Sequence, residues 1–234
     1  MMLPVLLLAD SRLPSGGHGH SGGVEALVDR GLLRTAEDLE LFLEGRVRTG
    51  GRVVAAAAAA ACALAEHAEH AEHADRAGWA DWDAAVSART PSAALRAASR
   101  AQGAALLRTV SLAFPAPAVT ALRALPRVHH PLVLGAAAAA AGASPAEAAG
   151  LALHHVVGGA STAAVRLLGL DPLRVTAVAA GVARSADPVA AEAAALAVAA
   201  VVAGDPTVLP TEGSPLTDVL AELHRASEAT LFAS

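Results

Sequence analysis

A capping residue stands directly before a proline repeatedly in this chain, and this pattern constrains the fold more than any other feature. Five such pairs are Thr90-Pro91, Ser144-Pro145, Asp171-Pro172, Asp187-Pro188 and Ser214-Pro215. The side-chain oxygen of such a residue accepts a first-turn N–H, and proline at the first helical position lacks only a donor that would have no partner. Each pair therefore predicts the start of a helix. Glu147, three residues after Ser144, completes a capping box, and Thr35 with Asp38 is a weaker example.

Apolar spacing between these starts predicts the helices themselves. Their ranges are roughly 22–30, 36–73, 91–113, 131–142, 145–168, 172–185, 188–203 and 215–230. The longest should bend or split at Gly50-Gly51, and the segment 74–88 is expected to be a surface connection or short helix. Because no alternating strand pattern occurs, we expect an all-α fold. It should form a single compact domain of about eight to ten helices over residues 1–234.

The composition excludes several classes of protein. With 54% hydrophobic and 17% charged residues the chain is not disordered, and a net charge of −5 argues against a nucleic-acid surface. The lone Cys62 lies in an alanine run, which favours a buried structural thiol over a catalytic one. The apolar run 53–65 is too short to span a membrane, and residues 188–203 are expected to form a buried helix. We expect a cytoplasmic protein that binds neither nucleic acid nor membrane.

No catalytic motif occurs, so no catalytic residue and no intrinsic cofactor are expected. A phosphate-binding glycine loop, a zinc-protease helix and a nucleophile elbow are all absent from the sequence. His67, His70 and His73 recur every three residues, and one adjacent pair could share a nickel ion. A solvated face of Glu/His pairs is the favoured interpretation, so these are weak metal candidates. The pairs 129–130 and 154–155 are expected to pack in the core or cap helices.

Two segments at opposite ends of the chain are unusual for such a helical protein. Residues 10–25 carry a cluster of glycines, which permit positive φ and close approach of another backbone. The tail carries an apolar stripe at 216, 219, 220 and 223 and ends on Leu231-Phe232, which should dock on its own core or on a partner. On the predicted helix 215–230, residues 217, 218, 222 and 225 are expected to face water. Arg166, alone in an apolar helix end, either extends along the helix or makes an interface ion pair.

Four stretches in order resemble the UreF family of urease accessory proteins. They are residues 7–17 (LLADSRLPSGG) with 20–25 (HSGGVE), 130–135 (HPLVLG), 161–170 (STAAVRLLGL), and the tail 214–218 (SPLTD) through His224 to 231–234 (LFAS). Together they reach both ends of the chain. The chain departs from the family pattern at His18, Arg225 and Thr230, which puts the loop packing and a charge pair of the tail in doubt.

The resemblance implies an all-helical, non-catalytic maturation factor that is usually a homodimer. Such proteins join UreD (also called UreH) and apo-urease, then recruit the GTPase UreG, and the complex handles the nickel. The hypothesised contact surfaces are the glycine loop 15–23, which lies in the glycine-rich N-terminal segment 1–23 (the glycine segment), and the tail 214–234. The partner-binding residues it suggests are Pro14, Gly16, Gly17, His20, Ser21, Gly22, Gly23, Glu25, Arg166, Asp218, His224, Leu231 and Phe232. The alternative is a histidine-based nickel storage or carrier protein that uses the run from His67 to His73.

Overall fold

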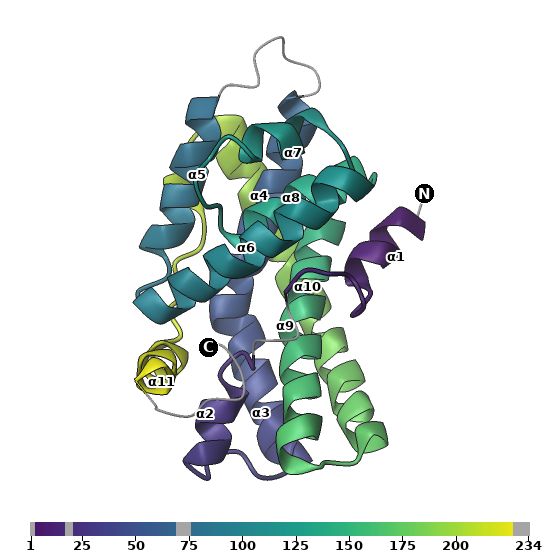
Figure 1. The fold of residues 1–234 in the computed structure, drawn as a ribbon, viewed down its shortest axis with the longest axis vertical. Coiled ribbons are helices and arrows are strands. Elements are labelled where there is room, and N and C mark those ends of the chain that lie inside the picture. Colours follow the sequence, from purple (N-terminus) through teal and green to yellow (C-terminus); the bar gives the residue numbers. More distant parts are fainter. Residues whose placement is uncertain (1–2, 17–20, 69–75, 227–234) are drawn as a thin grey trace.

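Helix α4 (Arg52–Ala68) is the centre of the structure, a computed structural model that describes residues 3–16, 21–68 and 76–226 (Figure 1). Every residue from Ala55 to Cys62 is at most 1% exposed, so the alanine run forms the middle of the hydrophobic core. The Cys62 thiol is buried as expected: it donates to the carbonyl of Ala143, and burial raises its pKa to about 12. A helix that is apolar on all sides is stable only when other helices surround it.

Three helices cover α4, and the others lie around this core. The covering helices are α8 (His130–Ala140), α9 (Pro145–Leu168) and α10 (Pro172–Ala203). The remaining elements are α1 (Leu3–Ala9), α2 (Val24–Asp29), α3 (Ala36–Arg46), the π-helical turn η2 (Val47–Gly51), α5 (Arg76–Ala88), α6 (Ala93–Ala113), α7 (Pro117–Leu122), the 3₁₀ turn η3 (Pro206–Val208) and α11 (Pro215–Arg225). No strand occurs in the described ranges, and nearly all the buried apolar residues form one cluster. The predicted all-α single-core fold is confirmed.

Small residues allow the central helices to approach one another closely. A Cβ atom built on Gly135 of α8 would lie 2.0 Å from the carbonyl oxygen of Ala58 and 2.7 Å from the Cβ of Ala61. Both neighbours belong to the rigid backbone region of α4 and cannot rotate away. The α4–α8 contact therefore requires residues as small as glycine and alanine where the two helices meet.

Most of the predicted helix starts are confirmed. Ser144 with Glu147 and Thr35 with Asp38 form reciprocal capping boxes, and Asp171 accepts the N–H of Leu173. Ser214 precedes α11 but makes no side-chain cap bond, and Thr90 is not a cap. Its hydroxyl donates to the carbonyl of Val86 and closes α5, while Ser92 caps α6 by accepting the N–H of Leu95.

The predicted break at Asp187-Pro188 is wrong, because α10 runs through Pro188 without interruption. Its buried residues keep one register across the proline. They are Val175, Val178, Val182, Ala186, Ala190, Ala193, Ala194, Ala197 and Ala200. Pro188 itself is exposed, so water can reach the carbonyl group whose helical hydrogen bond it removes. Continuous burial on both sides of the proline outweighs the loss of one exposed hydrogen bond.

Of the two alternatives for 74–88, a surface connection or a short helix, the structure shows a helix, α5, and it is packed on the core. Trp79 and Trp82 of α5 are each 4% exposed, which a solvated linker would not allow. The short helices α1 and α7 were not predicted. The bend expected at Gly50-Gly51 is present as the π-helical turn, in which Thr49 has non-helical φ and ψ. Gly51 is required there, since a Cβ would lie 2.7 Å from the carbonyl oxygen of Arg46.

Three helical stretches have the length and apolar composition to cross a membrane: Ala36–His67, Pro145–Leu168 and Pro172–Ala203. In the first two, 67% and 56% of the most apolar window is buried inside the protein, but in the third only 39% is. The prediction that 188–203 is a buried helix is therefore wrong for one face of α10. That face presents Val198 and Val202 to solvent among exposed alanines.

Candidate partner-binding site at the junction of the glycine segment and the tail helix

The glycine segment is fastened to the body at its start. Helix α1 buries Leu8, and its last carbonyl groups, those of Leu8 and Ala9, lie 2.8 and 3.3 Å from the Nε2 atoms of His155 and His154. These imidazoles satisfy carbonyls that have no partner within the helix, and burial lowers the pKa of His155. Further along, Thr109 of α6 donates to the carbonyl of Pro14 at 2.7 Å.

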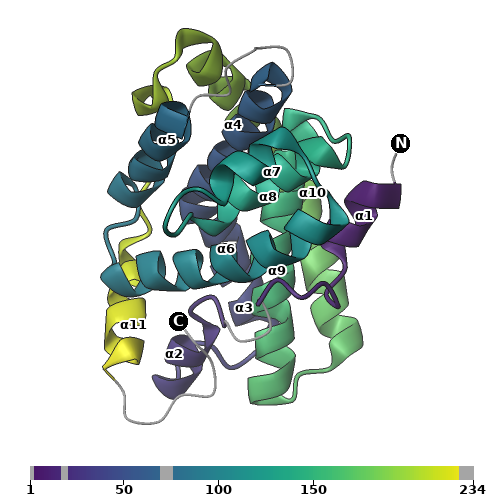
Figure 2. The same ribbon diagram turned by 45° about the horizontal axis from the view of Figure 1, so that its top comes forward.

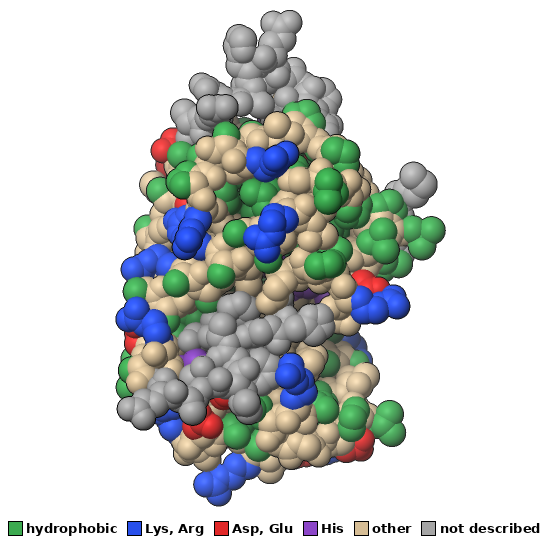
Figure 3. Space-filling model, in the orientation of Figure 1, with side chains coloured by type: hydrophobic (Ala, Val, Ile, Leu, Met, Phe, Trp, Pro, Cys, Tyr) green, Lys and Arg blue, Asp and Glu red, His purple; other side chains and the backbone are tan. Residues whose placement is uncertain are grey.

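The opposite face of α1 carries no such contacts. Leu3, Leu6 and Leu7 are each more than half exposed. In Figures 1 and 3 this helix projects from the right-hand side of the molecule, with apolar side chains on its outer surface. Next along the chain, Arg12 pairs with Asp10 at 2.7 Å in solvent, and this contact holds the pKa of Asp10 at about 2. The start of the segment is thus attached along one side only.

At its far end the segment turns through Gly22 and Gly23, whose φ angles are 62° and 96°. These left-handed conformations, which disfavour side chains, explain why the sequence needs glycine at both positions. Gly23 is the N-cap of α2, and no side chain caps that helix. Arg46 of α3 donates to the carbonyl of Gly22, so a residue far along the chain fixes the turn.

Arg46 also connects the glycine turn to the tail helix. Its guanidinium lies 6.0 Å from the ring centre of Phe42 and close to both glycines and Asp218. Burial lowers the pKa of Arg46 to about 10, while the Asp218 carboxylate opposes this effect. Nothing in the local sequence around Arg46 indicated this role, because its partners lie in two distant segments.

A buried contact between a histidine and a glutamate joins the tail helix to α2, which follows directly after the glycine segment. Nε2 of His224 in α11 lies 3.3 Å from Oε2 of Glu25 in α2, and both side chains are at most 5% exposed. Figures 1 and 2 both show α11 beside α2 and the first turn of α6. The structure therefore brings together Gly22, Gly23, Glu25, Asp218 and His224, which the sequence placed at opposite ends of the chain.

The orientation predicted for α11 is right for Leu220, which is buried, and for Arg225, which is exposed, but wrong for most of the helix. Its buried residues are Thr217, Leu220, Ala221 and His224, whereas Leu216, Val219 and Leu223 are 55%, 57% and 45% exposed. Residues expected to face water instead satisfy the start of α6: Glu222 accepts the hydroxyl of Ser92 and the N–H of Ala94, and Asp218 accepts the N–H of Ser92. These donors lower the pKa of Glu222 to about 2. Of the predicted apolar stripe of α11, Leu216, Val219 and Leu223 thus face solvent, whereas Leu220 is buried.

A cavity of about 410 Å³ opens beside this junction. Its lining includes Ser15 and Gly22 of the glycine segment, Asp218 of α11, and exposed Arg166 of α9. Ser21 is buried next to the junction, while a Cβ atom built on Gly16 would lie 3.2 Å from the Cβ of Ala105 in α6. Gly17, His18, His20, Thr230, Leu231 and Phe232 lie outside the described residues, so their predicted roles stay predictions.

The histidines do not form a metal centre in the described chain. His67 is exposed, and its Nδ1 lies 2.7 Å from the carbonyl oxygen of Ala63, while His70 and His73 lie outside the described residues. Within residues 3–16, 21–68 and 76–226, no three His, Cys, Asp or Glu groups are placed to share an ion. Rings of His130 and His155 are 5.8 Å apart, but they belong to the cavity wall and the α1 contact.

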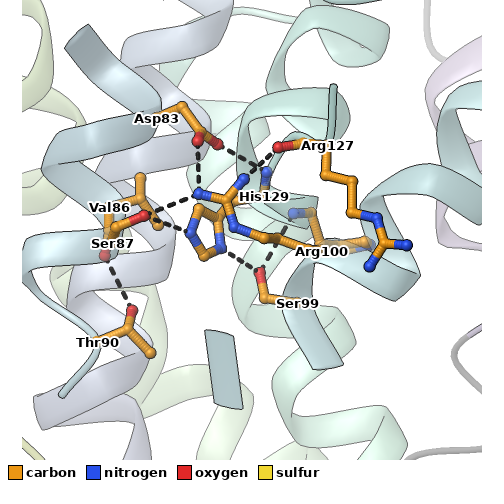
Figure 4. A network of polar contacts seen from close by, with 9 residues as sticks. Asp83, Val86, Ser87, Thr90, Ser99, Arg100, Arg127 and His129 are labelled. Atoms are coloured by element: carbon orange, nitrogen blue, oxygen red, sulfur yellow. Dashed lines mark hydrogen bonds and ion pairs between the residues drawn. The ribbon is translucent and has the colours of Figure 1, made fainter. Parts of the chain in front are cut away.

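Sequence reasoning missed a buried polar cluster around His129, the residue that precedes α8. Figure 4 shows its ring between two serines: Nδ1 lies 3.0 Å from Oγ of Ser99, and Nε2 lies 2.9 Å from Oγ of Ser87. Asp83 accepts the backbone N–H of His129 at 2.9 Å and pairs with Arg100 at 2.7 Å. His129 is completely buried, and burial lowers its pKa to about 4.

This cluster contains serine, histidine and aspartate but lacks the arrangement of a hydrolase. A catalytic triad needs the carboxylate on the ring N–H, where it stabilises the imidazolium. Here Asp83 holds the main chain, and a ring with a pKa of about 4 is a weak base at neutral pH. The cluster therefore acts as a structural junction of α5, α6 and α8.

The neutral state of His129 predicts a loss of stability in acid. An unfolded histidine titrates near pH 6.5, so the unfolded chain binds this proton first as the pH falls. Between pH 7 and 4, the stability that His129 confers should decrease by about 3 kcal/mol. Urea denaturation of the wild-type protein and His129→Asn at several pH values measures this contribution. The stability difference between the two proteins should shrink toward pH 4; a constant difference would contradict a neutral buried ring.

A family model and full-length relatives that are similar to this chain all carry the same family name. The family model described as UreF matches residues 33–183. Three relatives are named urease accessory protein UreF: those of Mycobacterium sp. (strain JLS), Mycolicibacterium vanbaalenii and Mycobacterium marinum, at 43%, 40% and 38% identity. Each alignment covers 98% of this chain and 97% of the relative.

Proposed function

Because the chain belongs to the UreF family of urease accessory proteins, we propose that it is a scaffold that binds UreD and recruits UreG. In this role it helps to deliver nickel into apo-urease and catalyses no reaction of its own. Nickel is the cargo of the assembled complex rather than a cofactor resident in this chain. The observation that supports a scaffold is the junction itself, where the glycine segment and the tail helix meet beside an exposed apolar stripe.

The tail helix has the properties of a docking element. Leu216, Val219 and Leu223 lie on one side of α11 and are about half exposed, although the helix is firmly fixed by its polar side. Burying a leucine or valine side chain contributes roughly 1.5–3 kcal/mol, so a partner that covers this stripe gains substantial binding energy. We assign this stripe to UreD. Arg166 and the adjoining cavity wall are the hypothesised contacts of a further partner.

Co-expression of the chain with UreD, UreG and apo-urease tests this function. A tag on the chain should retain UreD, and retention of UreG should depend on the presence of UreD. A chain that retains neither partner under conditions that activate urease would contradict the proposal. The histidine storage alternative has no support among the described residues, where no three metal-binding side chains converge.

We also propose that two copies associate through α10. The second half of this helix exposes Ala191, Ala195, Val198 and Val202 at spacings of four, three and four residues, which is one helix face. Small residues on that face allow a second helix to approach closely. Glu192 is the charged residue on this part of the helix and pairs with Arg52 at 3.7 Å.

A charge on this face should separate the copies. Val198→Glu would bury a carboxylate without a partner in the interface, which costs several kcal/mol. In analytical ultracentrifugation the wild-type protein should sediment as a dimer and Val198→Glu as a monomer. Thr176→Glu, an exposed position in the first half of the same helix, is the matched control and should remain dimeric. A wild-type monomer at micromolar concentration would contradict the assignment.

A further inference from the structure

Arg89, the residue that follows α5, donates almost entirely to the connection between α10 and α11. Its Nε lies 3.3 and 3.0 Å from the carbonyl oxygens of Leu209 and Pro210. Its second terminal nitrogen lies 3.0 Å from the carbonyl oxygens of Pro206, Thr207 and Leu209. The remaining nitrogen donates to Ala85 in its own helix. One side chain therefore binds four consecutive or near-consecutive carbonyls of a single turn.

No carboxylate pairs with Arg89 within the described part of the chain. Burial lowers the pKa of its guanidinium, and the backbone carbonyl dipoles take the place of a counter-ion. The planar guanidinium has five N–H groups and can donate hydrogen bonds to carbonyls in several directions, whereas the ammonium of lysine donates from a single nitrogen. Arginine is thus specifically suited to this position.

A second arginine holds the same connection closer to the tail helix. Arg52, at the start of α4, pairs with Glu212 at 2.8 Å. Glu212 and Ser214, the residues just before α11, line the cavity together with Arg89. The connection that leads into α11 is therefore attached to α5 and to α4, two helices of the core. The same connection is also held by apolar packing, because Leu209 is 3% exposed and belongs to the hydrophobic core.

We propose that Arg89 is the positioning residue of the tail helix. By fixing residues 206–210, Arg89 sets the position at which α11 begins. It thereby also sets the positions of Leu216, Val219 and Leu223, the residues that a partner would contact. The part of this inference that concerns partner binding rests on the function proposed above. The part that concerns the position of α11 does not, because it applies to the free chain.

Hydrogen exchange of the free protein tests the position of α11 directly. Arg89→Met keeps much of the apolar length but removes all the donors, and Arg89→Lys keeps the charge but not the planar guanidinium. In both variants, amides of 206–225 should exchange at least tenfold faster, while those of α4 and α8 change less than twofold. Arg123→Met, an exposed arginine without an ion pair in the described chain, is the control and should match the wild-type protein.

Unchanged exchange of 206–225 in Arg89→Met would overturn the inference. If that variant loses protection throughout the chain, Arg89→Lys decides: a selective loss over 206–225 supports the role, and wild-type exchange overturns it. In a second measurement, the affinity of Arg89→Lys for UreD should fall at least tenfold, with Arg123→Met unaffected. Failure of the wild-type protein to bind UreD would contradict the proposed function and leave the exchange result standing.

Discussion

Replacing Gly135 with alanine is expected to lower the free energy of unfolding by about 4 kcal/mol or more, although it adds a single methyl group. The new Cβ would lie 2.0 Å from the carbonyl oxygen of Ala58 and 2.7 Å from the Cβ of Ala61. Neither atom belongs to a flexible side chain, so α8 would have to move away from α4. That movement would loosen the contact on which the whole core is built. Urea denaturation followed by circular dichroism measures the loss.

The same substitution elsewhere provides a matched control. Gly150 lies within α9, and a Cβ built there meets no atom within 4 Å. Gly150→Ala should therefore raise the free energy of unfolding by roughly 0.5–1 kcal/mol, because alanine loses less backbone entropy in a helix. If Gly135→Ala unfolds at the same urea concentration as Gly150→Ala, then α4 and α8 are not in backbone contact.

The double variant Leu216→Glu/Leu223→Glu should abolish retention of UreD while leaving the fold intact. Both leucines are about half exposed in the free chain, so the change costs little stability. The acidic groups would lie on the exposed side of α11 and leave the contacts of its buried side unaltered. In the complex, the same carboxylates would be buried without partners, a cost of several kcal/mol that should weaken binding at least a hundredfold. Affinity retention of UreD by the tagged chain, with unfolding midpoints measured in parallel, checks both statements.

Leu112→Glu is the control for this variant. Leu112 of α6 is 88% exposed, which makes it a more exposed leucine than either position on α11. The control should retain UreD as the wild-type protein does, because a general loss of surface apolarity is not what binding depends on. Equal loss in Leu112→Glu would mean that the effect is not specific to the tail helix.

Local sequence signals predicted helix starts well and failed where long-range contacts decide. Ser144 and Asp171 were identified because a cap acts on its own next few residues. Pro188 misled the prediction, since the register of buried residues on both sides outweighs one lost hydrogen bond. That register was visible in the sequence as a stripe from Val175 to Ala200. For α5, the two tryptophans were the signal of burial, but Asp81 between them and Asp83 directly after them concealed it.

In the candidate site, too, local features could be predicted from the sequence and long-range contacts could not. The need for glycine at 22 and 23 could be predicted from the sequence, because positive φ is a local property. The stripe on α11 was also visible, but its direction was not: the helix is held by Glu222 at the start of α6 and by the buried His224–Glu25 pair. Arg46 and Arg89 left no local signal, because both act on backbone carbonyls of distant segments.

Hydrogen exchange of the chain alone and in complex with UreD tests most directly whether the junction is the docking surface. The account predicts that 215–225 becomes the most strongly protected part of the chain when UreD binds, with smaller gains in the glycine segment. Strong new protection elsewhere, with 215–225 exchanging as in the free chain, would contradict it.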